Sequence, residues 1–148
     1  MMKKIDNISI FTDGGSRGNP GEAASAFIIY DDDNNIVYKE GKRIGQGTNN
    51  EAEYKAVIFA LKWISENLEV SNNINFFLDS ELVASQLSGK YKVKSENIRN
   101  YFFSARLLED KVSPPHSEPK TKIIYTAIRR EQNKEADKLV NLALDNKI

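Results

Sequence analysis

Four carboxylates occupy positions in the sequence where a charged side chain is unexpected. Asp13 and Asp79 each follow a short apolar run of the kind that forms a buried strand. Glu53 falls on the same helical stripe as Val57, and Asp137 lies in the first turns of an amphipathic segment near the end of the chain. All four carboxylates can therefore point into one region of a folded domain.

A group of carboxylates needs a neutralising partner. Like charges held together repel one another and raise one another's pKa values unless a cation is present. The chain has no cysteine and a single histidine, so the available ligands are oxygens, which suit Mg²⁺ or Mn²⁺. Four acidic ligands can hold two ions, the arrangement that clamps the attacking and leaving oxygens of a phosphoryl displacement. The pattern therefore favours two-metal-ion chemistry on a phosphate ester.

Each carboxylate also has an ordinary structural explanation. Asp13 precedes two glycines and could form a turn, and Asp79 could cap the helix that follows it. Glu53 could belong to a capping box at Thr48 or its neighbour, and Asp137 could be one member of an i, i+4 pair. We favour a shared site because four unrelated explanations would otherwise have to hold at once.

The elements that must position these residues follow from the apolar pattern. Short apolar runs between turn residues predict strands, and apolar residues at three-to-four spacing predict helices. Three early strands followed by strand–helix alternation predict an α/β fold with a mixed sheet. The carboxyl ends of the first and fourth strands then lie side by side, where open sheets bind ligands. The expected strands are 8–12 (ending at a turn over 13–15), 23–30, 36–38, 74–78 and 122–127, and the expected helices are 49–67, a short one ending near 87, 95–111 and 133–146.

Length and composition predict one domain over residues 1–148. The chain is 40% hydrophobic and 28% charged, which suits a single core. The lack of cysteine excludes a disulfide scaffold and a cysteine nucleophile, and it fits a reducing compartment. Apolar runs are too short to cross a bilayer, and none follows the N-terminal lysines, so we expect no membrane anchor, no signal peptide and a cytoplasmic location.

The formal net charge is zero, but the charges are distributed unevenly. Residues 1–85 carry 8 Lys and Arg against 13 Asp and Glu, and residues 86–148 carry 13 against 8. From charge alone, chance scatter on a solvated surface is favoured over a nucleic-acid partner as the explanation of this split. Charge alone therefore does not identify a partner.

Four sequence strings, taken together, resemble those of type 1 ribonuclease H. They are residues 12–21 (TDGGSRGNPG), 48–53 (TNNEAE), 78–80 (LDS) and 133–137 (NKEAD), and they occur in the family's order over nearly the whole chain. The resemblance implies a ribonuclease H-like fold, a five-stranded mixed sheet in the order 3-2-1-4-5 flanked by helices. It also implies endonucleolytic cleavage of the RNA strand of RNA–DNA hybrids, leaving 5′-phosphate and 3′-hydroxyl ends.

The resemblance assigns a metal-binding and catalytic role to each carboxylate. Asp13 looks like the ligand shared by both Mg²⁺ or Mn²⁺ ions, Glu53 and Asp79 like ligands of one ion, and Asp137 like a ligand of the other. Glu51 competes with Glu53, but both the family pattern and the helical stripe favour Glu53.

The resemblance also implies contacts to the hybrid, whose RNA strand is distinguished by its 2′-hydroxyl groups. Glycine backbone can approach a substrate closely because it carries no side chain. The residues expected at the substrate are Gly14, Gly15 and Ser16 through their backbone, Asn19 and Asn49 in the minor groove, Asn50 at the DNA strand, and Thr48 at a DNA phosphate.

Two segments depart from the family's pattern. Some members carry a longer basic helical protrusion where this chain has only alternating lysines, which we expect to contact phosphates unless they form a solvated edge. Many members also carry a loop histidine, but Ala127 stands ten residues before the last carboxylate, and an arginine is expected to take its place. The lysines are Lys90, Lys92 and Lys94, the arginine is Arg129 or Arg130, and His116 is expected to be a surface residue.

Two other functions fit the same fold. A module could bind hybrids without cutting them, or the chain could be another two-metal nuclease or phosphatase. Four intact carboxylates favour the enzyme, because a non-cutting reader has no reason to keep their mutual repulsion. We expect the enzyme to act as a monomer on an RNA–DNA hybrid.

Overall fold

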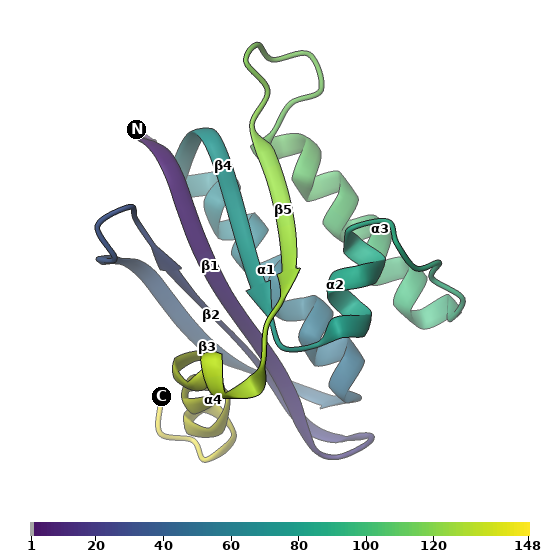
Figure 1. Cartoon of the computed structure of the whole chain (residues 1–148). Coiled ribbons are helices and arrows are strands. Elements are labelled where there is room, and N and C mark those ends of the chain that lie inside the picture. The colour runs from purple at the N-terminus through teal and green to yellow at the C-terminus, as the bar shows by residue number, and fades with distance from the viewer. Residues whose placement is uncertain (1) are drawn as a thin grey trace.

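A single five-stranded sheet forms the centre of the computed structural model, which describes residues 2–148 (Figure 1). The strand order is β3-β2-β1-β4-β5; the first three strands are antiparallel neighbours, whereas β4 runs parallel to both β1 and β5. The predicted strand order and mixed directions are confirmed. The strands are β1 (Lys3–Gly18), β2 (Gly21–Tyr30), β3 (Ile36–Gly47), β4 (Leu68–Leu78) and β5 (Lys122–Ala127), and the helices are α1 (Asn49–Asn67), α2 (Glu81–Leu87), α3 (Glu96–Val112), α4 (Lys134–Leu144) and the 3-10 turn η1 (Arg130–Gln132).

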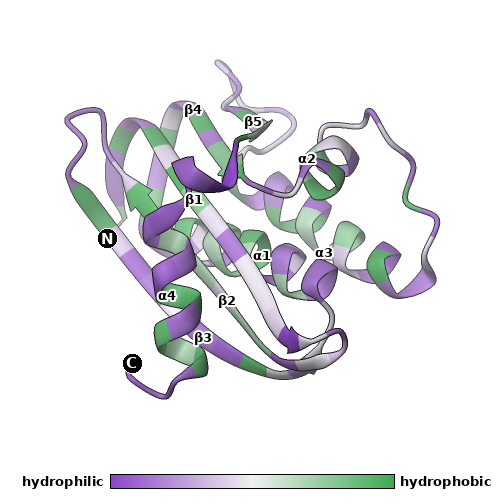
Figure 2. Cartoon of the chain, turned by 60° about the horizontal axis from the view of Figure 1, so that its bottom comes forward, coloured by the Kyte–Doolittle hydropathy of each residue, from purple (hydrophilic) through white to green (hydrophobic). Residues whose placement is uncertain are grey.

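Two hydrophobic cores lie on opposite faces of this sheet. Neighbouring residues of a strand face opposite sides, and along β2 Phe27 and Ile29 belong to the core beneath α1, whereas Ala26 and Ile28 belong to the core beneath α4. The α1 core is large and also receives side chains from α2 and α3. Figure 2 shows α4 crossing the sheet with apolar and polar bands alternating along it. Helices therefore cover both faces of the sheet.

The start of α1 is fixed by a capping box. The Thr48 hydroxyl accepts from the backbone N–H of Glu51 at 3.1 Å, and the Glu51 carboxylate accepts from the backbone N–H of Thr48 at 3.0 Å. Such reciprocal caps stabilise a helix start by about 1 kcal/mol. The predicted helix 49–67 is confirmed, and it fixes the position of Glu53 one turn inside its N-terminal end.

The predicted turn over residues 13–15 is wrong, because β1 continues through it to Gly18. Asp13, Gly14 and Gly15 pair with β2 instead. A Cβ at Gly14 would lie 2.2 Å from the backbone carbonyl carbon of Ala52, so this glycine lets α1 pack directly on β1. The chain reverses later, where Gly18 adopts a φ of +103°.

Other boundaries differ from those expected at polar segments. β3 continues to Gly47 and β4 begins at Leu68, well beyond the short apolar runs that predicted them. Backbone pairing with β2 and β1 carries these polar residues into the sheet.

Within residues 2–148, no helix is both long and apolar enough to span a membrane.

Candidate active site

Two of the four carboxylates lie where the parallel pairing of β1 and β4 ends. The last paired residues are Thr12 and Leu78, and the residue that follows each of them in the chain is an aspartate, Asp13 or Asp79. β1 remains paired to β2 at this point, so Asp13 lies within a strand rather than in a loop. This topology places two carboxylates side by side at one edge of the parallel pair.

Glu53 completes a compact cluster with these two aspartates. One carboxylate oxygen from each of Asp13, Glu53 and Asp79 lies within 4.8 Å of the others. Asp13 and Glu53 are each only 6% exposed, whereas Asp79 is half-buried. Three oxygen donors at this separation are compatible with a shared cation.

Asp137 lies at the rim of the cluster rather than within it. It is an exposed residue of α4, and it lines the same cleft of about 500 Å³ as the other three carboxylates. Its Oδ2 lies 3.5 Å from Asn141 Nδ2, which supports the i, i+4 pairing as an additional local contact. The structure therefore gathers all four predicted carboxylates around one cleft, with three of them in direct proximity.

The buried carboxylates resist ionisation. Burial, followed by the charge of Asp79, raises the pKa of Asp13 to about 7. Burial, followed by the charges of Asp13 and Asp79, raises the pKa of Glu53 well above its ordinary value. Glu53 Oε2 is buried without a hydrogen-bond partner among residues 2–148. An all-oxygen cluster with an unpaired buried oxygen fits a divalent cation, which would supply the missing partner.

Asn133 connects the elements that carry the other site residues. Its side-chain Nδ2 donates to the carbonyl oxygen of Thr12 at 2.8 Å and lies 3.4 Å from Asp79 Oδ2. The backbone carbonyl oxygen of Asn133 accepts from the backbone N–H of Asp137 at 3.1 Å. The residue is 1% exposed. Asn133 was expected only as the first residue of the last helix, 133–146, and no role in the site was assigned to it.

Glu51 is held away from the cluster. Its side chain completes the capping box and accepts from the Tyr101 hydroxyl at 3.1 Å. The hydrogen bonds from Thr48 hold the pKa of Glu51 below its usual range. The capping-box explanation considered for Glu53 thus applies to Glu51 instead.

Several of the residues expected at the substrate line the cleft: Gly14, Gly15, Ser16, Asn49, Asn50 and Arg130. Ser16 and Asn49 are joined, because the Ser16 backbone N–H donates to Asn49 Oδ1 at 2.9 Å. Asn19 Oδ1 accepts from the Asn49 backbone N–H at 3.1 Å, so Asn19 helps to hold Asn49 in place. Thr48 is the N-cap of α1 and does not line the cleft.

The other predicted substrate contacts lie away from the cleft. Lys90 lines a separate groove beside β5, and Lys92 and Lys94 are exposed in the segment between α2 and α3. Arg129 is exposed and pairs with Glu131 at 3.4 Å. Of the two arginines proposed to replace the loop histidine, Arg130 is therefore the one that reaches the cleft.

Known proteins are similar to this chain in sequence and in fold. A family model described as reverse transcriptase-like matches residues 11–143. A ribonuclease H from Campylobacter concisus is 32% identical over 118 residues, which cover 74% of this chain and 73% of that protein. The structure of LC11-RNase H1 in complex with an RNA/DNA hybrid matches with a TM-score of 0.85 and 36% identity, over 94% of this chain and 97% of the other. The chain belongs to the type 1 ribonuclease H family.

Some ribonuclease H family members are much longer than this chain. The bifunctional protein Rv2228c of Mycobacterium tuberculosis is 34% identical over 140 residues, 93% of this chain but 35% of the relative. The chain thus spans about a third of the length of the mycobacterial relatives that it matches. The matched residues 11–143 include the first and the last of the four carboxylates in the sequence, Asp13 and Asp137.

Proposed function

We propose that the chain is an endoribonuclease that cleaves the RNA strand of RNA–DNA hybrids and leaves 5′-phosphate and 3′-hydroxyl ends. The observation that carries this proposal is the cluster of Asp13, Glu53 and Asp79 within 4.8 Å, at the end of the β1–β4 pair. The similarity to a ribonuclease H structure containing an RNA/DNA hybrid supports this choice of substrate. One domain over residues 1–148, acting as a monomer in the cytoplasm, is part of the same proposal.

The carboxylates are proposed to hold two Mg²⁺ or Mn²⁺ ions. Asp13 would be shared between them, Glu53 and Asp79 would complete one site, and Asp137 would contribute to the other. The bound ions would supply a water of lowered pKa as nucleophile and would stabilise the charge of the departing 3′ oxygen. Asp137, exposed at the rim of the cleft, would contribute its carboxylate from there.

The chain's own residues are proposed to orient the hybrid. The backbone of Gly15 and the joined pair of Ser16 and Asn49 line the cleft with polar groups, which are proposed to recognise 2′-hydroxyls. Arg130, which also lines the cleft, is proposed to attract the scissile phosphate. Asn50, Asn19, Thr48, Arg129 and the lysines Lys90, Lys92 and Lys94 are proposed as further contacts along the substrate.

A cleavage assay tests the proposal. Labelled RNA–DNA hybrid, duplex DNA and a single strand would be incubated with the protein in Mg²⁺ or Mn²⁺, with Asp13→Asn as the inactive variant and the exposed Asp33→Asn as the matched control. We expect cutting of the RNA strand of the hybrid by wild type and Asp33→Asn, and none by Asp13→Asn. Hybrid binding without cutting in either metal would select a binding module, and equal cutting of duplex DNA would select a different nuclease.

A further inference from the structure

β5 is the outermost strand at its edge of the sheet (Figure 1). A second groove is lined by residues of β5 together with residues of α3 and the end of α2. Its volume of about 1070 Å³ is larger than that of the carboxylate cleft. It meets the C-terminal end of α2 at Leu87 and Ser88, whereas the cleft meets the N-cap of the same helix, Ser80. Ala127 in the groove is three residues before Arg130 in the cleft, so the two hollows adjoin along the chain.

The groove presents lysines from a firmly held backbone. Lys120 and Lys122 are exposed and flank Thr121, which is only 7% exposed. The Thr121 hydroxyl donates to the carbonyl oxygen of Val70 at 2.6 Å, and the Thr121 carbonyl accepts from the Ser113 hydroxyl. The two lysines therefore project from an ordered strand entry rather than from a free loop.

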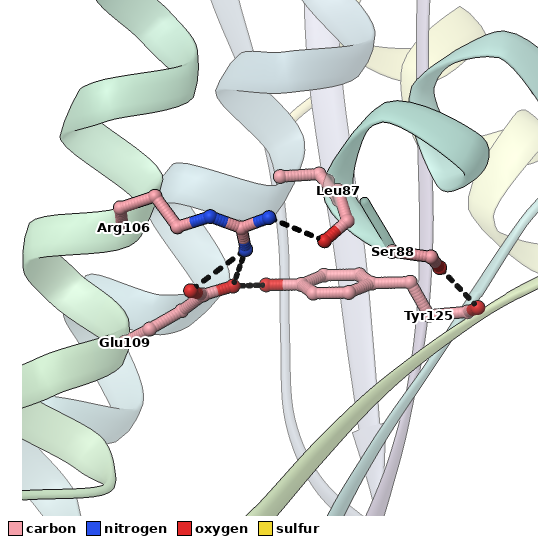
Figure 3. A network of polar contacts seen from close by, with 5 residues as sticks. All are labelled: Leu87, Ser88, Arg106, Glu109 and Tyr125. Carbon is pink, nitrogen blue, oxygen red and sulfur yellow. Dashed lines mark hydrogen bonds and ion pairs between the residues drawn. The ribbon is translucent and has the colours of Figure 1, made fainter. Parts of the chain in front are cut away.

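A network of polar contacts lining the groove pairs the acid Glu109 with its neighbours (Figure 3). Arg106 donates to both carboxylate oxygens of Glu109, at 2.8 and 2.9 Å, and to the carbonyl oxygen of Leu87 at 2.7 Å. The Tyr125 hydroxyl also donates to Glu109, at 2.6 Å, and the Ser88 hydroxyl donates to the Tyr125 carbonyl. The negative charge of Glu109 is therefore balanced by Arg106.

The remaining charges favour an anionic ligand. Apart from the paired Arg106 and Glu109, the groove's described lining residues include one acid, Asp110, and three lysines, Lys90, Lys120 and Lys122. Tyr91 does not line the groove, but it follows Lys90 in the chain, and its ring, 51% exposed, can stack on a base. Alternating cations and an exposed aromatic ring are typical of surfaces that bind single-stranded nucleic acid.

We propose that this groove binds a single-stranded DNA tail that continues beyond the hybrid, with Lys120 and Lys122 at its phosphates. The proposal rests on the proposed function, because the tail reaches the groove from a hybrid seated in the adjoining cleft. This continuity favours nucleic acid over an acidic peptide, which would have no reason to lie beside the carboxylate cleft. The enzyme would then hold hybrids at junctions with single strands more tightly than isolated hybrids.

Binding measurements with tailed hybrids test this inference. The Asp13→Asn protein, which is expected not to cut, would be titrated by fluorescence anisotropy with a blunt hybrid and with the same hybrid carrying a DNA tail of about ten nucleotides at its 5′ or 3′ end. Two single-strand phosphate contacts should steepen the dependence of log K on log salt by about 1.4 for one of the tailed hybrids. The advantage of that tail, meaning the affinity for the tailed hybrid divided by the affinity for the blunt hybrid, should then fall about sevenfold between about 50 and 200 mM salt.

Charge-matched variants show where the tail binds. Lys120→Gln with Lys122→Gln should abolish the tail's advantage and leave the blunt hybrid's affinity unchanged. Lys39→Gln with Lys62→Gln removes two exposed lysines that lie outside both hollows, and it should preserve the advantage. Thermal denaturation should be the same for all of these proteins, because the substituted lysines are exposed.

Three outcomes would overturn the inference. The groove assignment fails if neither tail improves affinity, or if the Lys120 and Lys122 substitutions leave the improvement intact. If blunt hybrid still binds in these cases, the proposed function survives. Displacement of the tail by an oligoglutamate of equal charge would assign the groove to acidic protein partners instead. Failure of the protein to bind even blunt hybrid would contradict the proposed function itself.

Discussion

Replacing Asp13 by asparagine should stabilise the metal-free protein at neutral pH, although it should abolish catalysis. The Asp13 carboxyl is buried, and its pKa rises from 3.8 to about 7 in the folded protein, first through burial and then through Asp79. A carboxyl that holds its proton more tightly when folded favours folding below pH 3.8, and this contribution is lost as the pH rises through 7. Asparagine does not titrate, so the variant avoids the loss.

The two pKa values set the size of the effect. A tenfold change in proton affinity corresponds to about 1.4 kcal/mol, and the interval from 3.8 to about 7 therefore gives a loss of about 4 kcal/mol by pH 8. The free energy of unfolding of Asp13→Asn should exceed that of wild type by about this amount at pH 8, and the excess should shrink towards zero at pH 4.

Urea denaturation in the presence of a chelator, at several pH values, measures this difference. Asp33→Asn, an exposed substitution in the hairpin turn, is the control and should follow wild type at every pH. Added Mg²⁺ should stabilise wild type, by about 2.7 kcal/mol at a hundred times its dissociation constant, and should leave Asp13→Asn nearly unchanged. Parallel pH profiles for wild type and Asp13→Asn in chelator would refute the reasoning.

Three further predictions concern neighbouring residues. Glu53→Gln should lower the rate of hybrid cleavage at least a hundredfold. Glu51→Gln should act mainly on the melting temperature and much less on the cleavage rate, because Glu51 caps α1. Equal cleavage rates for the two variants would contradict the assignment. Gly14→Ala should cost about 3 kcal/mol in urea denaturation, because its Cβ meets the backbone of α1, whereas Gly15→Ala should change stability by less than about 0.5 kcal/mol. Asn133→Ala should weaken Mn²⁺ binding in calorimetry more than it weakens hybrid binding, since it frees Asp79; unchanged Mn²⁺ affinity would count against this positioning role.

The apolar pattern correctly predicts those elements whose structure is determined by residues close to one another in the sequence. Helix α1 combines an apolar stripe with a capping box, and both signals are local, so its bounds follow from the sequence. β5 has the predicted bounds 122–127, between a proline-rich loop and a polar segment. The strand order, by contrast, came from the resemblance to a family rather than from the pattern.

The sequence misleads where a distant partner determines the backbone. Asp13-Gly14-Gly15 has the composition of a turn, yet these residues form strand because β2 pairs with them and α1 packs on Gly14. The polar half of β3 is a strand for the same reason. No local signal reveals that one amide, that of Asn133, reaches both β1 and Asp79, because these contacts join residues far apart in the chain.

The unequal sizes of the two cores have a consequence for inactivation. The core beneath α4 has six buried residues, of which three are alanines, Ala24, Ala26 and Ala143, whereas the larger core beneath α1 contains many aromatic and branched side chains. Small side chains bury little surface and therefore hold a helix weakly. On warming, α4 should come loose while the remaining sheet stays folded, carrying Asp137 away from the other carboxylates. The protein would then lose its capacity to cut before it melts, and cooling would restore that capacity without refolding of the whole chain.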